Sequence, residues 1–126
     1  MLREALADGV EVIERRAPAE QLLHGEPHPG NVLATADGPV FVDLETCCRG
    51  PVEFDVAHVP ASVAERYPGL DPTVLATCRR LVLTMVAAWR FDPDDRFPDG
   101  ERFGRALLAA LRSGPPWPTV DEVFDG

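Results

Sequence analysis

Apolar residues recur at helical spacing in the first stretch of the chain, residues 2–16. These apolar positions are Leu2, Leu6, Val10 and Ile13. Charged residues stand between them, which is typical of an amphipathic helix with one face on a core. Pro18 should end this helix, because proline lacks the amide hydrogen that a helix interior requires.

A second stretch, residues 72–91, is apolar almost all round, and its interior reads LVLTMVAAW. Asp71 suits the N-cap of a helix, and Pro72 suits its first position. A helix without a polar face must be covered on most sides. We therefore expect this segment to be the central and most buried element of the fold.

Two further helices are predicted. One runs from about residue 54 to residue 65, and Pro60 should break or kink it. The last helix covers residues 101–113 and has one apolar face. It follows the acidic loop DPDDRFPDG and precedes a proline-rich tail, which is expected to dock through Trp117.

The only predicted strands lie between the helix at 2–16 and the helix that begins at about residue 54. Asn31 to Ala34 forms a short strand, and PVFVDL, from Pro39 to Leu44, forms a second one rich in β-branched and aromatic residues. Asp37-Gly38 between them is a strong turn signal. We predict a single small β-hairpin at residues 32–43 and, for the whole chain, a mainly α fold class with one domain over residues 1–126.

Composition and charge narrow the possible partners. Hydrophobic residues make up 45% of the chain, so a folded core is expected, and 21 acidic residues against 12 basic ones give a net charge of −9. This balance argues against nucleic-acid binding, which rewards basic surfaces. It suits a cationic substrate or metal-bridged phosphates, although a merely acidic surface would have the same composition.

Cysteine usage and the N-terminus indicate a reduced, cytoplasmic protein. The three cysteines fit neither a disulfide framework nor a zinc spacing, and each is expected to be a small buried residue. The N-terminus carries acidic residues and lacks the apolar core of a signal peptide. No stretch approaches the roughly 20 apolar residues of a membrane span.

Four side chains with oxygen donors cluster around the predicted hairpin, namely Glu26, Asn31, Asp43 and Glu45. Such donors suit Mg²⁺, and the hairpin should bring Asn31 and Asp43 close together in space. An alternative metal site uses His24, Glu26 and His28, which would share one face of a strand. Pro27 and Pro29 argue against a regular strand there.

Three motifs in this region resemble those of a known enzyme family. HGEPHPGN (24–31) is similar to the H-G-D-x-x-x-x-N catalytic loop of the aminoglycoside phosphotransferase and choline kinase superfamily, relatives of the protein kinases. VDLE (42–45) resembles that family's metal-binding segment, and GP…FDVA (50–57) resembles its G-P-x-x-x-D-L-A motif. The resemblance implies the C-terminal lobe of the protein-kinase-like fold, with a catalytic loop at 24–31 and a metal segment at 43–45.

The resemblance also implies roles for individual residues. Glu26 would be the catalytic carboxylate that accepts or orients the substrate hydroxyl. Asn31 would bind Mg²⁺, and Asp43 would bridge Mg²⁺ and the phosphates of ATP, with Glu45 as a less certain metal ligand. Structural support of the loop would come from His24 and Asp55, whereas the role of His28 is left open.

Two features depart from the family pattern. Glu26 stands where the family usually has Asp, and its extra methylene changes the placement of the carboxylate, on which transfer depends. The chain also has no lysine and no glycine-rich loop, so the N-terminal lobe that clamps ATP is absent from it. We therefore expect the isolated chain to be inactive, and to need that lobe or to self-associate.

Two functions from different classes follow. The first is the catalytic lobe of an ATP-dependent phosphotransferase that acts on a hydroxyl of a small molecule, aminoglycoside-like or related. The second is a non-catalytic remnant or binding module with the same fold. The acidic loop at 92–101 could line a cleft for a cationic substrate, although a solvated loop is the simpler explanation of its composition.

Overall fold

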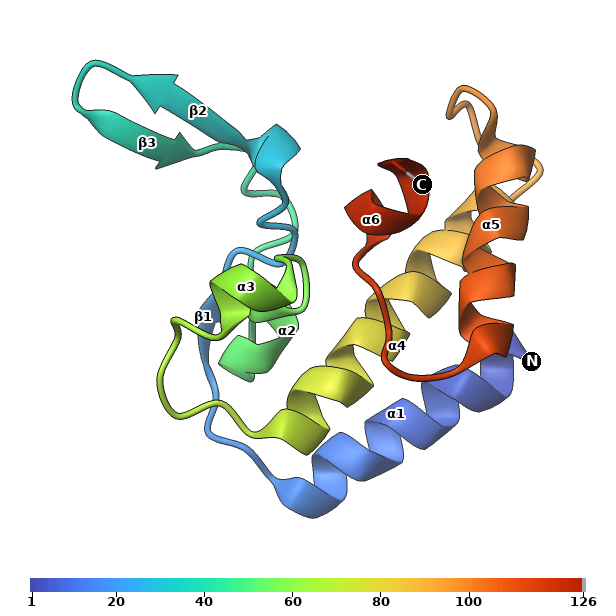
Figure 1. Ribbon diagram of the computed structural model, residues 1–126, viewed down its shortest axis with the longest axis horizontal. Helices are drawn as coiled ribbons and strands as arrows, with labels where there is room; N and C mark the ends of the chain where they lie inside the picture. The colour runs from blue at the N-terminus through green and yellow to red at the C-terminus, as the bar shows by residue number, and fades with distance from the viewer. Residues whose placement is uncertain (126) are drawn as a thin grey trace.

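The computed structural model describes residues 1–125 and is mainly helical, with two small antiparallel sheets. The helices are α1 (Leu2–Arg16), α2 (Val52–Val56), α3 (Ala61–Ala64), α4 (Pro72–Arg90), α5 (Gly100–Ser113) and α6 (Val120–Asp125), with the 3-10 helix η1 (Pro29–Asn31). The strands are β1 (Gln21–Leu23), β2 (Val32–Thr35), β3 (Gly38–Phe41) and β4 (Cys48–Gly50). Figure 1 shows the β2–β3 hairpin projecting from a helical body.

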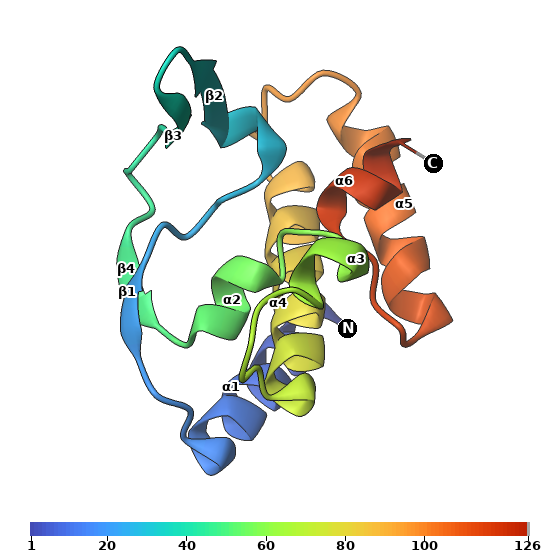
Figure 2. The ribbon, with the colours of Figure 1, turned by 60° about the vertical axis from the view of Figure 1, so that its left-hand side comes forward.

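Helix α4 is the centre of that body, as the apolar composition predicts. It contacts α1, α2, α5 and α6, and Figure 2 shows it between the β1–β4 side of the molecule and α5. Both hydrophobic clusters depend on it: Val74, Cys78 and Val82 pack with Ala57, and Leu83 and Ala87 pack with Leu107 and Leu111. The prediction that this segment is the most buried element is confirmed.

Helix α1 has the predicted bounds, and three of the four predicted apolar positions are half-buried, but its fully buried residues lie beside them. Ala5 and Gly9 are its buried residues, whereas Val10 is 49% exposed. The physical reason is the close approach of α1 to α4, since a Cβ added to Gly9 would lie 2.6 Å from Cδ2 of Leu81. Small residues therefore occupy the contact itself, and larger ones such as Ile13 pack beside it.

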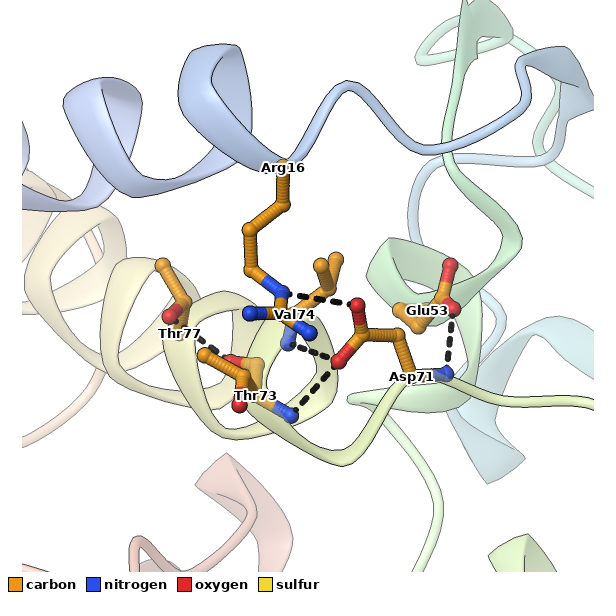
Figure 3. A network of polar contacts seen from close by, with 6 residues as sticks. All are labelled: Arg16, Glu53, Asp71, Thr73, Val74 and Thr77. Atoms are coloured by element: carbon orange, nitrogen blue, oxygen red, sulfur yellow. Dashed lines mark hydrogen bonds and ion pairs between the residues drawn. The ribbon is translucent and has the colours of Figure 1, made fainter.

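Asp71 joins three helices at one point (Figure 3). Its carboxylate accepts hydrogen bonds from the Thr73 and Val74 amides, so it caps α4 as predicted, and it accepts another from Nε of Arg16 at 2.8 Å. Its own amide donates to the buried carboxylate of Glu53 on α2, at 2.9 Å. The Arg16 guanidinium lowers the pKa of the Asp71 carboxyl below its usual value.

The hairpin forms as predicted, with Val32 opposite Phe41 and Thr35 opposite Gly38. The expectation of only one strand pair is wrong, because β1 and β4 form a second pair with Leu23 opposite Cys48. Each of these strands has three residues, and their partner lies far along the chain, so neither carries a recognisable local pattern.

Two further boundaries differ from the sequence prediction. The helix expected at 54–65 is divided into α2 and α3, with Pro60 as the N-cap of the second helix. The C-terminal tail does contain a helix, α6, although Trp117 packs against the second hydrophobic cluster as expected. Thr119 precedes α6 and accepts the amide hydrogen of Glu122, which is an N-cap signal that the sequence analysis overlooked.

Within residues 1–125, none of the helices combines the length and the apolar character needed to cross a membrane.

Candidate active site

The loop at residues 24–31 is held at its start by Asp55 of α2. The Asp55 carboxylate accepts the amide hydrogens of His24 and Gly25, each at 2.9 Å. Gly25 has a φ of 97°, and a Cβ there would lie 2.2 Å from the carbonyl oxygen of Thr46. Only glycine fits this position, so the loop lies directly against the segment that follows the hairpin.

The His24 ring connects the loop to the end of the hairpin. Its Nδ1 accepts the amide hydrogen of Glu26 at 3.1 Å, so the ring proton is on Nε2. Nε2 donates to the carbonyl oxygen of Val42 at 2.7 Å, and the ring centroid lies 5.7 Å from that of Phe41. Both ring nitrogens are engaged with the main chain, so His24 supports the geometry of its neighbours.

Asn31 is anchored by its side chain and its main chain. It is 8% exposed, and its Nδ2 donates to the carbonyl oxygen of Glu26 at 2.9 Å. Its carbonyl oxygen accepts the amide hydrogen of Val42 at 2.8 Å, one residue before Asp43. With the amide nitrogen occupied in this way, Oδ1 is the atom that remains for a cation.

Asp43 adopts a left-handed backbone conformation, with a φ of 60°, and its side chain is exposed. This conformation costs a residue with a Cβ about 1 kcal/mol, although Asp tolerates it better than most. Glu45, two residues later, is also exposed. The structure therefore presents both carboxylates to solvent beside the hairpin, and their metal-binding roles stay predictions.

The donor set fits Mg²⁺ held jointly with phosphates. Among residues 1–125, no group of three or more His, Cys, Asp and Glu side chains could hold a metal. The alternative metal site of His24, Glu26 and His28 is disfavoured as well. Both ring nitrogens of His24 are hydrogen-bonded to the main chain, so neither is available to a metal. Oxygens from Asn31 and Asp43 suffice for Mg²⁺, which takes one or two protein ligands plus phosphate and water oxygens.

His28 caps the short helix η1. Its Nδ1 accepts the amide hydrogen of Gly30 at 3.1 Å, and its Nε2 lies 3.3 Å from Nδ2 of Asn31. The ring therefore shapes the turn that carries Asn31, which is a structural position that the sequence alone left open.

A cavity of about 730 Å³ opens beside the loop. Its polar and charged lining includes Glu26, His28, His58, Arg90 and Asp121. Its apolar lining comprises Phe54, Val82, Met85, Val86, Trp89, Phe97, Val120 and Phe124. The cavity thus joins the loop at 24–31 to α4 and α6, and its apolar residues are functional candidates that the sequence analysis missed.

The acidic loop before α5 contributes no carboxylate to this cavity. Asp95 is instead paired with Arg90, with 3.0 Å between Oδ1 and NH2, and both side chains are 13% exposed. The Arg90 guanidinium also lies 4.2 Å from the ring centroid of Phe97. The loop therefore supplies an aromatic wall, and its remaining acids fit the alternative of a solvated loop.

His58 lines the cavity as a neutral ring. Burial lowers its pKa below the usual value of 6.5. Nδ1 lies 3.0 Å from the carbonyl oxygen of Phe54, so the proton is on Nδ1 and Nε2 is an acceptor. An acceptor at this position could receive a hydrogen bond from a ligand in the cavity.

The cysteines divide into two environments. Cys78 is buried as expected, and burial raises its pKa to about 12. Cys47 and Cys48 are exposed, which corrects the expectation of burial, because Cys47 directly precedes the β4 strand and Cys48 begins it. Cys48 also lines the cavity, and desolvation raises the pKa of its thiol above the usual value.

Comparisons with known proteins agree with this geometry. The model of a family described as "Phosphotransferase enzyme family" matches residues 2–97. A segment of 45 residues is 38% identical to a methylthioribose kinase of Geobacillus thermodenitrificans (strain NG80-2). The aligned segment covers 36% of this chain and 11% of that kinase, so the chain spans a small part of the relative's length. No solved structure matches the chain at a significant level.

Proposed function

This chain belongs to the phosphotransferase enzyme family, whose model covers most of its length, and we propose that it forms the catalytic C-terminal lobe of a protein-kinase-like fold. In this proposal, the complete enzyme is ATP-dependent and transfers a phosphoryl group to a hydroxyl of a small molecule. The helical body with a projecting hairpin is compatible with such a lobe.

One observation carries the proposal: three motifs separated in sequence form a single hydrogen-bonded unit next to a cavity. Asp55 bonds to His24 and Gly25, His24 bonds to Val42, and Val42 bonds to Asn31. The unit therefore places the loop carrying Glu26 and Asn31 against the segment that carries Asp43. Such placement is the main requirement of phosphoryl transfer, in which the protein acts chiefly by positioning and electrostatics.

Each residue has a distinct task in this proposal. Glu26 lines the cavity, so its carboxylate would accept the proton of a substrate hydroxyl bound there, or orient that hydroxyl. Its main chain is fixed on both sides, by His24 through its amide and by Asn31 through its carbonyl oxygen. Asn31 and Asp43 would hold Mg²⁺ bound to ATP, with Glu45 as a further candidate. Bound Mg²⁺ neutralises charge on the phosphates during transfer.

In this proposal the phosphate clamp comes from residues outside the sequence described here. A kinase of this type grips the phosphates with a lysine and covers them with a glycine-rich loop. The 126 residues contain neither. We therefore propose that a separate segment supplies the clamp, and that it covers the exposed apolar side chains of Leu22, Phe41 and Leu44; a second copy of the chain is the alternative cover.

The test joins this chain to the nucleotide-binding lobe of a family member placed before Met1. Transfer of the γ-phosphoryl group from radiolabelled ATP to a panel of small alcohols would be measured with and without Mg²⁺. We expect Mg²⁺-dependent product that Glu26→Gln reduces at least tenfold, with unchanged circular dichroism. Glu20→Gln is the matched control, because Glu20 is an exposed residue outside the cavity.

The alternative function is a non-catalytic binding module with the same fold. It would retain the cavity but show no transfer when the nucleotide-binding lobe is supplied. Saturable binding of an alcohol together with an absence of any phosphorylated product would favour this alternative over the enzyme.

A further inference from the structure

We propose that the cavity beside Glu26 selects an alcohol that carries an apolar, aryl-sized body and a single ammonium group. This inference rests on the proposed function, since it names the substrate class of the same site. It excludes a polyhydroxylated sugar as the preferred ligand. Three independent features of the cavity carry it.

The first feature is an apolar stripe on α4. Val82, Met85, Val86 and Trp89 follow helical spacing on one face of the helix, and all four line the cavity. Val82 and Val86 pack into the hydrophobic clusters, whereas Met85 is half-buried and Trp89 is 44% exposed, so the stripe extends from the core into the cavity. An apolar wall of this kind favours an apolar ligand, and it gives the hydroxyls of a sugar no replacement for their lost hydrogen bonds to water.

Aromatic rings from outside α4 also line the cavity. Phe97 and Phe124 lie with their centroids 5.8 Å apart, and Phe103 packs against both. The Arg90 guanidinium stacks on Phe97 and is tied to Asp95, which fixes the ring. The aromatic wall is therefore held in place by contacts among its own residues, and it suits the flat face of an aryl group.

The second feature is the charge of the lining. Glu26 and Asp121 form no ion pair within residues 1–125, whereas the positive charge of Arg90 is compensated by Asp95. Two uncompensated carboxylates remain, one of which receives the hydroxyl in the proposed reaction. The other, Asp121, together with the aromatic faces, favours one ammonium group on the ligand.

The third feature is the origin of the wall. The family match ends at residue 97, whereas Val120, Asp121 and Phe124 belong to α6. Part of the cavity wall is thus contributed by residues beyond the matched region, whereas the α4 stripe and Phe97 lie within it. The Asp121 carboxylate and the Phe124 ring, on which the proposed preference depends, therefore lie outside the family match.

The test measures binding to the full chain without nucleotide. Trp117→Phe leaves Trp89 as the only tryptophan, so quenching of its fluorescence reports on the cavity. The probes are 2-(benzylamino)ethanol, its uncharged isostere 2-(benzyloxy)ethanol, ethanolamine, and ribose. We expect saturable quenching by the first probe, with a Kd at least about tenfold lower than for ethanolamine or ribose, and about threefold lower than for the isostere.

Asp121→Asn should remove the preference for the charged probe over its isostere, with the aryl-dependent binding retained. Glu122→Gln is the matched control, because Glu122 is an exposed neighbour that does not line the cavity. If Trp117→Phe does not fold, saturation-transfer NMR of the same four probes on the unaltered chain replaces the fluorescence measurement.

Ribose or ethanolamine binding as tightly as the aryl amine would overturn the inference, and so would the absence of saturable binding by the aryl amine. Neither result touches the phosphotransferase proposal, which is decided by transfer from ATP. Conversely, aryl amine binding without any transfer in the joined protein would contradict the phosphotransferase proposal alone.

Discussion

Asp55 and His24 are 31 residues apart in the sequence, yet the Asp55 carboxylate accepts the His24 amide hydrogen at 2.9 Å. The same carboxylate accepts the Gly25 amide hydrogen through its other oxygen. One side chain on a short helix thereby fixes the start of the loop that carries the proposed catalytic residue.

Asp55→Ala should loosen this loop. Two amide hydrogens would lose a charged acceptor in a half-buried site, so the free energy of unfolding should fall by about 1–3 kcal/mol. Urea denaturation gives that value, and hydrogen exchange should show faster exchange at His24 and Gly25. Asp37→Ala, in the hairpin turn, is the control and should leave both amides protected. Unchanged exchange in Asp55→Ala would contradict the bracing role.

Substitutions of Asp43 should affect the stability of the fold and phosphoryl transfer in different ways. Asp43→Gly removes the cost of the left-handed conformation, so the free energy of unfolding should rise by about 1 kcal/mol relative to Asp43→Ala. Both variants should lose Mg²⁺-dependent transfer when joined to a nucleotide-binding lobe. Asp37→Gly serves as the control, because Asp37 is not among the residues with positive φ in the described part of the chain. Transfer retained by Asp43→Ala would refute the metal assignment.

Gly9→Ala should destabilise the chain, although alanine is normally the better helix residue by about 1 kcal/mol. The added methyl group would overlap with the buried side chain of Leu81, so we expect a net loss of about 1–3 kcal/mol. The double variant with Leu81→Ala tests the cause, because the loss from Gly9→Ala should largely vanish when Leu81 is truncated. A fully additive double variant would show that the two residues do not clash.

His58 should make stability depend on pH. Its folded-state pKa is lowered by burial, so below about pH 6.5 the unfolded chain binds a proton that the folded chain does not. The free energy of unfolding should therefore fall as the pH drops from 7.5 to 5.5. His58→Gln should flatten this slope, whereas His28→Gln, which changes a different ring in the same cavity, should retain it. Equal slopes in unaltered protein and His58→Gln would argue against the assignment.

The isolated chain should bind Mg-ATP weakly, with a Kd above about 100 μM, and transfer no phosphoryl group. No lysine is available as a clamp, and a net charge of −9 disfavours an anionic nucleotide. Isothermal titration is the measurement. A Kd in the low micromolar range would mean that another cation replaces the lysine; Arg49, 77% exposed and 3.9 Å from Glu20, would then be the first residue to replace.

The sequence predicts those parts of the fold that have a local signal. Asp71-Pro72 marks the start of α4, and Asp37-Gly38 marks the hairpin turn, because each pair sets the backbone at its own position. The loop at 24–31 was recognisable for a similar reason, since its polar residues stand at fixed spacing. In all three cases the physical cause lies within a few residues.

The remaining features depend on contacts between distant segments. Gln21 pairs with Gly50 across the fold, and the short sequence of neither strand predicts this pairing. Gly9 has no side chain to count in a hydrophobic pattern, although it forms the tightest point between α1 and α4. The cavity escapes prediction most completely, because Glu26 and Phe124 come from opposite ends of the chain.

The contact between Gly9 and Leu81 also determines when α1 can pack against α4 during synthesis. During synthesis, α1 leaves the ribosome before its helical partner α4, which emerges about 70 residues later. Until then, the small residues of α1 have nothing to pack against, and the intervening loop and hairpin remain tethered at one end. Closing a contact across so many residues carries an entropic cost, so the helical body is completed only after α4 has emerged.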